Sequence, residues 1–141
     1  NGKTAKMKKF DDKISQSILA KLRENSRISW QQLGAAVHLS PQACAERVRQ
    51  MQDAGVIGGF TLRENRPRHF ITVLMAHNRF AEFERFLHSE SGIESADKTS
   101  GDGCYHIVYT ADTPSELEAF LARLSPHGRY RVASGLKRVV G

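Results

Sequence analysis

Cysteine is scarce in this chain of 141 residues, which holds only Cys44 and Cys104. Two cysteines are too few for a disulfide framework, so we expect both to be reduced. No apolar run approaches the roughly 20 residues of a membrane-spanning helix, which predicts that the chain has no membrane partner. A secretory signal pattern is also missing, so the expected location is the cytoplasm.

Signatures of the common enzyme and cofactor sites are missing as well. The sequence contains no nucleophile elbow, phosphate-binding loop or dinucleotide fingerprint. Its six histidines are scattered, and none has an acidic or cysteine partner at the spacing of metal ligands. We therefore expect no metal, no cofactor and no catalytic residues.

Positive charge is in excess, and it is concentrated in the N-terminal half. The net charge is +6. Residues 1–66 hold 12 Lys or Arg against 6 Asp or Glu, whereas residues 67–141 hold 9 of each. Four of the lysines lie within residues 1–9, which reduces the weight of this asymmetry. The distribution favours an N-terminal half that binds nucleic acid.

Two capping signals predict a pair of short helices with a tight turn between them. Ser29 is followed three residues later by Gln32, which is the pattern of a capping box. Ser40 can cap a second helix with Pro41 in its first turn, and Gly55 ends that helix as a left-handed cap. Such a pair forms a helix-turn-helix, whose second helix enters the major groove of DNA. The apolar stripes are Leu33 and Val37 in the first helix and Cys44, Val48 and Met51 in the second.

The segments beside this pair complete an expected DNA-binding domain over residues 7–62. Residues 1–6 have no apolar pattern, resemble an expression remnant and are left out of the fold. Asp11 or Asp12 can cap a preceding helix. The β-prone segment Val56–Leu62 contains two glycines, which predicts a short wing or connecting strand. The expected buried face of the first helix is Ile14, Ile18, Leu19 and Leu22.

The C-terminal half alternates strands with helices after a polar linker at residues 63–70. Alternating apolar residues over 71–75 predict a strand. One helix carries four apolar residues on one face between Phe80 and Leu87, and another begins at a capping box at Thr113. Further strands are expected over residues 93–99, 105–111 and 129–139. The order βαββαβ predicts a ferredoxin-like sandwich over residues 71–141. The expected class is α+β, with an N-terminal winged helix-turn-helix followed by this sandwich.

Several short motifs carry a resemblance to a known family. They are Arg27-Ile28-Ser29, Leu39-Ser40-Pro41, Arg47-Val48-Arg49, Ala54-Gly55-Val56-Ile57 and, in the second half, Ser100-Gly101-Asp102. With these motifs the chain resembles the leucine-responsive/asparagine regulator (Lrp/AsnC) family of transcription factors. The resemblance implies a DNA-binding regulator that senses an amino acid and assembles as a dimer, often as an octamer. One departure is Ser15, which stands where the family usually has an aspartate.

The second helix of the pair has one side that faces away from its apolar stripe. Gln can pair with adenine, Arg can pair with guanine, and Ala can contact a thymine methyl group. Arg47 lies on the flank, where a phosphate or a neighbouring acidic side chain is the expected partner. Trp30 follows a helix cap and is expected to pack. The residues expected to contact double-stranded DNA are Arg27, Ser29, Ser40, Pro41, Gln42, Ala43, Glu46, Arg47, Arg49 and Gln50.

The turn at residues 100–104 has two interpretations. The resemblance implies an effector site for an amino acid or related small molecule, formed by Ser100, Gly101, Asp102, Gly103 and Cys104. Alternatively, the turn is only a hairpin that uses Asp-Gly for its positive φ angles.

Assembly and a competing function complete the expectations. A ferredoxin-like unit of about 70 residues leaves one sheet face open, so we expect sheets of two chains to pack into a dimer, with an octamer as a further possibility. The alternative function is an enzyme subunit similar to sirohaem decarboxylases, which resemble the family in fold. The apolar residues assigned to the dimer face are Ile71, Val73, Met75, Tyr105, Ile107 and Tyr109.

Overall fold

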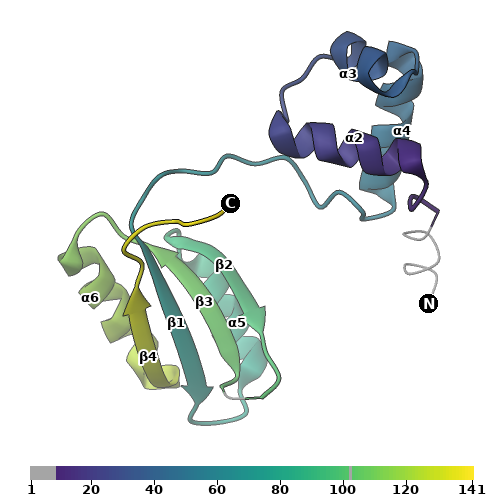
Figure 1. Cartoon of the computed structure of the whole chain (residues 1–141). Helices are drawn as coiled ribbons and strands as arrows, with labels where there is room; N and C mark the ends of the chain where they lie inside the picture. The colour runs from purple at the N-terminus through teal and green to yellow at the C-terminus, as the bar shows by residue number, and fades with distance from the viewer. Residues whose placement is uncertain (1–8, 102) are drawn as a thin grey trace. The chain divides into compact units, whose positions relative to one another are not determined.

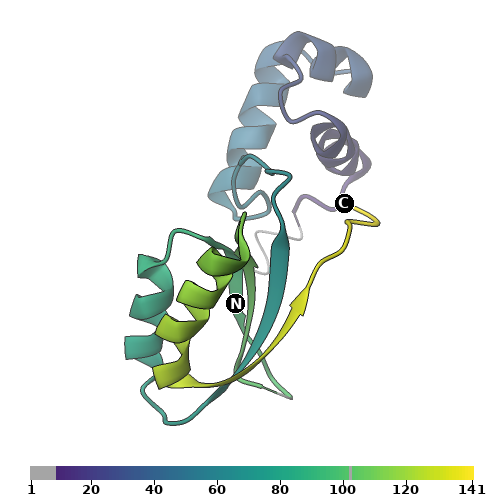
Figure 2. The ribbon, with the colours of Figure 1, turned by 90° about the vertical axis from the view of Figure 1, so that its left-hand side faces the viewer.

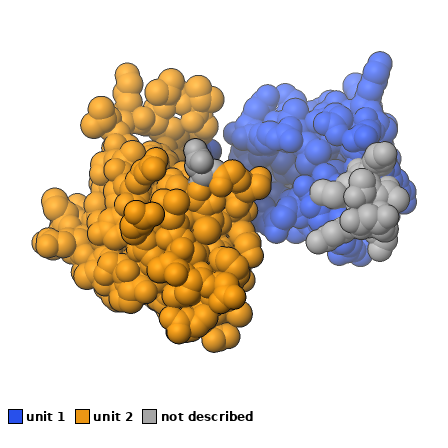
Figure 3. Space-filling model, turned by 90° about the horizontal axis from the view of Figure 1, so that it is seen from below, with its two compact units in different colours: residues 1–63 blue, residues 64–141 orange. Residues whose placement is uncertain are grey.

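The computed structural model describes residues 9–101 and 103–141. The chain divides into two compact units, residues 1–63 and residues 64–141 (Figure 3). The first unit is helical, and the second combines helices with an antiparallel sheet, which confirms the α+β class. The expectations for residues 1–6 and for Asp102 fall outside the described residues.

Three helices lie within residues 9–63 of the first unit (Figure 1). The expected caps are confirmed, because in each helix the side-chain oxygen of the cap residue accepts a hydrogen bond from the backbone N–H three residues later. His38 takes a left-handed conformation in the turn before Ser40. The helices, with their caps, are α2 (Lys13–Glu24, Asp12), α3 (Trp30–Val37, Ser29) and α4 (Pro41–Asp53, Ser40).

One apolar cluster holds these helices together. Ile18, Leu33 and Met51 are fully buried in it, and Phe10, which precedes α2 in the sequence, is also buried there. The face expected for α2 is wrong at one position, because Ile14 is 36% exposed and Ser15 is fully buried in its place. The other members of the cluster are Leu22, Val37, Cys44, Val48 and Ala54.

The end of α4 is formed as expected, but the wing is not. Gly55 has a φ of 79°, and the N–H groups of Gly55 and Val56 donate to the carbonyls of Gln52 and Met51, which is the Schellman arrangement. Residues 9–63 contain no strand, so the wing or strand predicted for Val56–Leu62 is wrong. Val56 and Ile57 pack against the helical cluster instead, whereas Phe60 and Leu62 are exposed. A strand would also need a partner that the described part of this unit does not provide.

The second unit follows the βαββαβ order that was expected. Its four-stranded antiparallel sheet has the order β2-β3-β1-β4, and both helices lie on the same face of it (Figures 1 and 2). The Thr113 cap is confirmed by a hydrogen bond from the N–H of Glu116. The elements are β1 (Arg68–Met75), α5 (Phe80–Ser89), β2 (Ile93–Lys98), β3 (Tyr105–Thr110), α6 (Pro114–Leu124), the 3-10 turn η1 (Ser125–His127) and β4 (Gly128–Ser134).

Two strand boundaries differ from the sequence expectation by more than one residue. β1 begins at Arg68, inside the segment expected to be linker. β4 ends at Ser134 and not at Val139. Ser134 pairs with His69, and the N–H of Gly135 donates to the carbonyl of Arg68, so the start of β1 leaves no further backbone for β4 to pair with.

The helices cover the face of the sheet that had been assigned to the dimer, and the opposite face is open. Phe83 of α5 and Phe120 of α6 are fully buried against the sheet residues that had been assigned to the dimer. That assignment is wrong, because those residues form the core beneath the helices. Strand alternation places the other set on the open face, on which no helix of the described residues packs. This set includes Phe70, Thr72 and Leu74 of β1 and His106 and Val108 of β3.

Candidate nucleic-acid interface

Helix α4 has one side fixed in the core and one side exposed. Cys44, Val48 and Met51 are almost completely buried, and this inward stripe orients the helix. The burial of the Cys44 thiol raises its pKa, which keeps it in the neutral form. The inward and outward division of α4 expected from the sequence is confirmed. The outward side chains are Gln42, Ala43, Glu46 and Arg49, all exposed, with Gln50 half-buried beside them.

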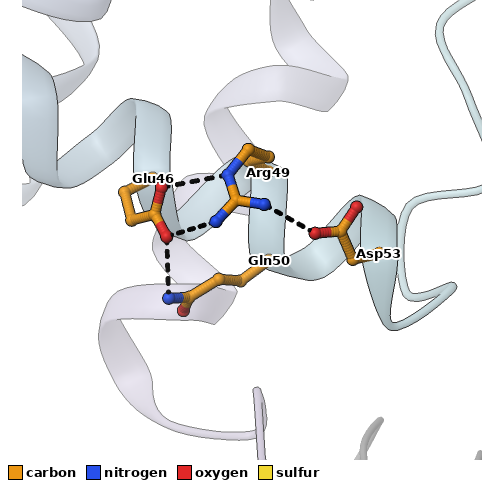
Figure 4. Close-up of polar contacts among 4 residues, drawn as sticks. All are labelled: Glu46, Arg49, Gln50 and Asp53. Carbon is orange, nitrogen blue, oxygen red and sulfur yellow. Dashed lines mark hydrogen bonds and ion pairs between the residues drawn. The ribbon is translucent and has the colours of Figure 1, made fainter.

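Arg49 is held by two acidic side chains on this outward side (Figure 4). Its Nε and Nη2 donate to the two carboxylate oxygens of Glu46 at 3.0 and 2.6 Å, and its Nη1 donates to Asp53 at 2.8 Å. Gln50 also donates to Glu46, at 3.2 Å. The hydrogen bonds from Arg49 lower the pKa of the Glu46 carboxyl, and the same contact raises the pKa of the Arg49 guanidinium. The Glu46–Arg49 pair therefore stays ionised, and Asp53 places a second carboxylate beside the one guanidinium.

Arg47 leaves α4 toward the first helix. Its Nη1 donates to the carboxylate of Asp12 at 2.9 Å and to the hydroxyl of Ser15 at 3.1 Å. An acidic partner was one of the two expected for this flank residue. Ser15 is fully buried, and Asp12, the cap of α2, supplies the carboxylate to Arg47.

The remaining expected DNA contacts surround the start of α3 and α4. Ser29, Ser40 and Pro41 are exposed, and both serine hydroxyls accept capping hydrogen bonds while keeping their own proton for another partner. Arg27 is exposed just before α3, and its backbone N–H donates to the side chain of Asn25. Trp30, expected to pack, is 43% exposed at the first position of α3 and is not part of the buried cluster.

The expected effector residues lie in the hairpin between β2 and β3. Gly101 and Gly103 have φ values of 93° and 89°, which only glycine adopts readily. A side chain at Gly103 would collide with the methyl group of Thr72. The Cys104 N–H donates to the carbonyl of Val73 at 2.7 Å, so this turn is tied to β1. Ser100 is exposed, and Asp102 lies outside the described residues.

The described residues contain neither a cluster of metal ligands nor a helix that could span a membrane. Within 9–101 and 103–141 there is no group of three or more His, Cys, Asp or Glu that could hold a metal ion. In the same part of the chain, every helix is too short or too polar to cross a membrane.

Comparison with known proteins places this geometry in context. Residues 12–52, which span α2, α3 and nearly all of α4, match the AsnC-type helix-turn-helix domain. The transcriptional regulator LrpA of Bacillus subtilis (strain 168) is 32% identical over 129 residues, covering 86% of this chain and 95% of that protein. LrpC of the same organism is 30% identical over 124 residues, covering 84% of this chain and 86% of that protein.

Solved structures agree with this match at the level of the fold. The structure of B. subtilis LrpC has a TM-score of 0.82 at 24% identity and covers 92% of this chain and 96% of that one. The transcriptional regulator NMB0573 of Neisseria meningitidis, solved as a complex with L-Met, has a TM-score of 0.79 at 24% identity and covers 92% of each chain.

Proposed function

The chain belongs to the Lrp/AsnC family of transcriptional regulators, and from this premise we propose that it binds specific sequences of duplex DNA through the outward side of α4. Members of this family are regulators and not enzymes, so the alternative of a sirohaem-decarboxylase-like subunit is not supported. Because such a regulator binds chromosomal DNA, the location that we propose for it is the cytoplasm.

One observation carries the proposal. The buried stripe of α4 fixes the helix while Gln42, Ala43 and Arg49 remain exposed along its other side. These are the residue types that pair with adenine, thymine methyl and guanine edges in the major groove. Arg27, Ser29 and Ser40 are exposed around the starts of α3 and α4 and can donate to phosphate oxygens, which position a protein on DNA without reading its sequence. Arg47 uses Nη1 for Asp12 and Ser15, and its other N–H donors are the ones proposed for a phosphate.

A selection experiment tests this proposal directly. The purified protein is mixed with random duplex DNA, and the bound fraction is sequenced. One enriched motif is expected, with half-sites about one helical turn apart if the protein binds as a dimer. The double variant Gln42→Glu, Ala43→Glu should enrich nothing, because it adds two carboxylates to the outward side. The variant Ala122→Glu, on an exposed position of α6, is the matched control. A wild-type pool without any shared motif would refute sequence-specific binding.

Dimer formation through the open face of the sheet is part of the proposal. Phe70, Leu74 and Val108 give this face an apolar centre, and each is half-buried in the single chain. Covering such a face is the usual requirement of a two-layer fold. A dimer would present two α4 helices to two half-sites, and an octamer would be built from such dimers.

The proposed effector is an amino acid or a related small molecule at the turn of residues 100–104. The support is the solved L-Met complex of the relative NMB0573, together with exposed polar groups at Ser100 and Gly101. L-methionine should raise the melting temperature of the wild type, and Asp102→Ala should abolish the shift while DNA binding stays intact. A shift that survives Asp102→Ala would move the site away from this turn.

A further inference from the structure

Arg49 uses the two edges of its guanidinium unequally, with two hydrogen bonds to Glu46 on one edge and a single hydrogen bond from Nη1 to Asp53. Nε and Nη2 form the side edge, and both donate to the carboxylate of Glu46. The end edge, between Nη1 and Nη2, faces no bidentate partner among the described residues, because Asp53 accepts from Nη1 alone. A guanidinium has five N–H donors, and two parallel donors suffice for the O6 and N7 atoms of guanine.

We propose that Glu46 is a positioning residue that makes Arg49 a reader of bases and not a phosphate clamp. This inference rests on the proposed function, because it concerns how the outward side of α4 selects a sequence. The carboxylate holds the side edge of Arg49 through two donors, so a guanine at the end edge would displace only the single hydrogen bond from Nη1 to Asp53. It also accepts from the Gln50 amide at 3.2 Å, so that one acidic group orients two side chains that can read bases (Figure 4).

The charges of the cluster lead to the same assignment. Glu46 and Asp53 together outweigh the single charge of Arg49, so this part of α4 offers no net positive charge to the DNA backbone. Non-specific binding depends on the number of phosphates that Lys and Arg neutralise. Arg49 paired with Glu46 therefore adds little to binding on arbitrary DNA, and its contribution is confined to duplexes that place a guanine at its end edge. Free of Glu46, the same guanidinium would contact phosphates of any sequence.

Two variants with the same change of charge separate positioning from electrostatics. Glu46→Gln and Asp53→Asn each remove one negative charge beside Arg49, but only Glu46 occupies its side edge. Full-length protein is titrated against the selected duplex and a scrambled duplex at several salt concentrations. Glu46→Gln should lower the ratio of specific to non-specific affinity about tenfold. It should also steepen the salt dependence on scrambled DNA by about one unit, because Arg49 gains a phosphate.

Asp53→Asn is expected to tighten binding to both duplexes to a similar extent and to leave their affinity ratio unchanged. Thermal melting of both variants checks that the exposed substitutions leave the fold intact. Equal effects of Glu46→Gln and Asp53→Asn on the affinity ratio would overturn the inference and reduce Glu46 to a surface charge, with the proposed function unaffected. A wild type that does not distinguish the two duplexes would overturn both.

Discussion

Arg47 of α4 donates a hydrogen bond of 2.9 Å to Asp12, the residue that caps α2. The two residues lie 35 positions apart in the chain, and their contact ties the helix proposed to read DNA to the first helix of the unit. One carboxylate therefore caps the start of α2 and also binds Arg47 of α4. This double use makes the first unit sensitive to the protonation of Asp12.

The first prediction concerns pH. A side-chain hydrogen bond with Ser15, then the hydrogen bond from the Ser15 backbone N–H and the charge of Arg47, lower the pKa of Asp12 below its ordinary value of 3.8. A lowered pKa in the folded state contributes stability that is present above the unfolded pKa and is lost as the pH falls through the folded one. Asp12→Asn keeps a capping side chain but removes the charge. The variant should melt below the wild type at neutral pH, and the difference should vanish in acid. A difference that is constant across this range would exclude the charge of Asp12 as its cause.

The second prediction concerns the close approach of α3 to the turn that follows it. A Cβ atom at Gly34 would collide with the backbone carbonyl oxygen of Leu39, and backbone cannot move aside as a flexible side chain can. Gly34→Ala should therefore lower the melting temperature and displace α4, with loss of DNA binding. Gly58→Ala is the matched control, since a Cβ there meets nothing within 4 Å. It should be neutral or stabilise the protein by about 0.4–1 kcal/mol. Equal melting temperatures for the two variants would contradict the close approach.

The third prediction uses Tyr105, whose pKa is strongly raised. Tyr105 is 2% exposed and donates a hydrogen bond of 2.7 Å to Glu84. Burial, with the hydrogen bond to Glu84, raises the pKa of Tyr105 to about 12. Stability from this group is complete below the unfolded pKa of about 10 and is lost as the pH rises toward 12. The melting temperature of the wild type should fall faster over this range than that of Tyr105→Phe. Parallel curves for the two proteins would refute the shift.

Local signals in the sequence predicted the helices well. The caps at Asp12, Ser29 and Ser40 and the left-handed end at Gly55 depend on residues within one turn of each other, so they can be read without knowledge of the tertiary structure. The contacts of Arg49 with Glu46 and Asp53 have the same local character, because three and four residues separate neighbours on a helix. That spacing was visible in the sequence, but Arg49 had been considered only as a partner of DNA.

The errors arose where a distant partner decides the outcome. The end of β4 is set by where β1 begins, and Val56–Leu62 forms no strand because the unit offers no partner. Alternation in β1 divides Ile71 and Val73 from Phe70 and Leu74, but it does not say which set the helices cover. The residue that pairs with Arg47 could not be identified from the sequence either, since Asp12 is distant in the chain.

The fourth prediction separates backbone contacts from base reading. Arg27 is exposed just before α3, and its side chain is free of the acidic cluster that holds Arg49. A phosphate contact does not depend on the DNA sequence, so Arg27→Ala should weaken binding to selected and scrambled duplexes by a similar factor. The salt dependence should fall by about one unit for the lost contact. Arg85→Ala, on an exposed position of α5, should change neither quantity. A loss confined to the selected duplex would make Arg27 a base contact.

The fifth prediction concerns the dimer and uses the corrected face of the sheet. Leu74 lies on the open side of β1, where strand alternation places it beside Phe70 and away from the core residue Val73. A glutamate at this position stays solvated in a single chain but would be buried without a partner between two packed sheets, which carries a large desolvation cost. Leu74→Glu should therefore shift the molar mass measured by light scattering from dimer to monomer at micromolar concentration. The variant should keep the far-ultraviolet circular dichroism of the wild type. Ala122→Glu adds the same charge to the exposed side of α6 and should remain dimeric.

Because a dimer engages two half-sites, the Leu74→Glu monomer should also bind a full operator no more tightly than a single half-site. A wild type that is monomeric, or a Leu74→Glu variant that stays dimeric, would rule out pairing through this face.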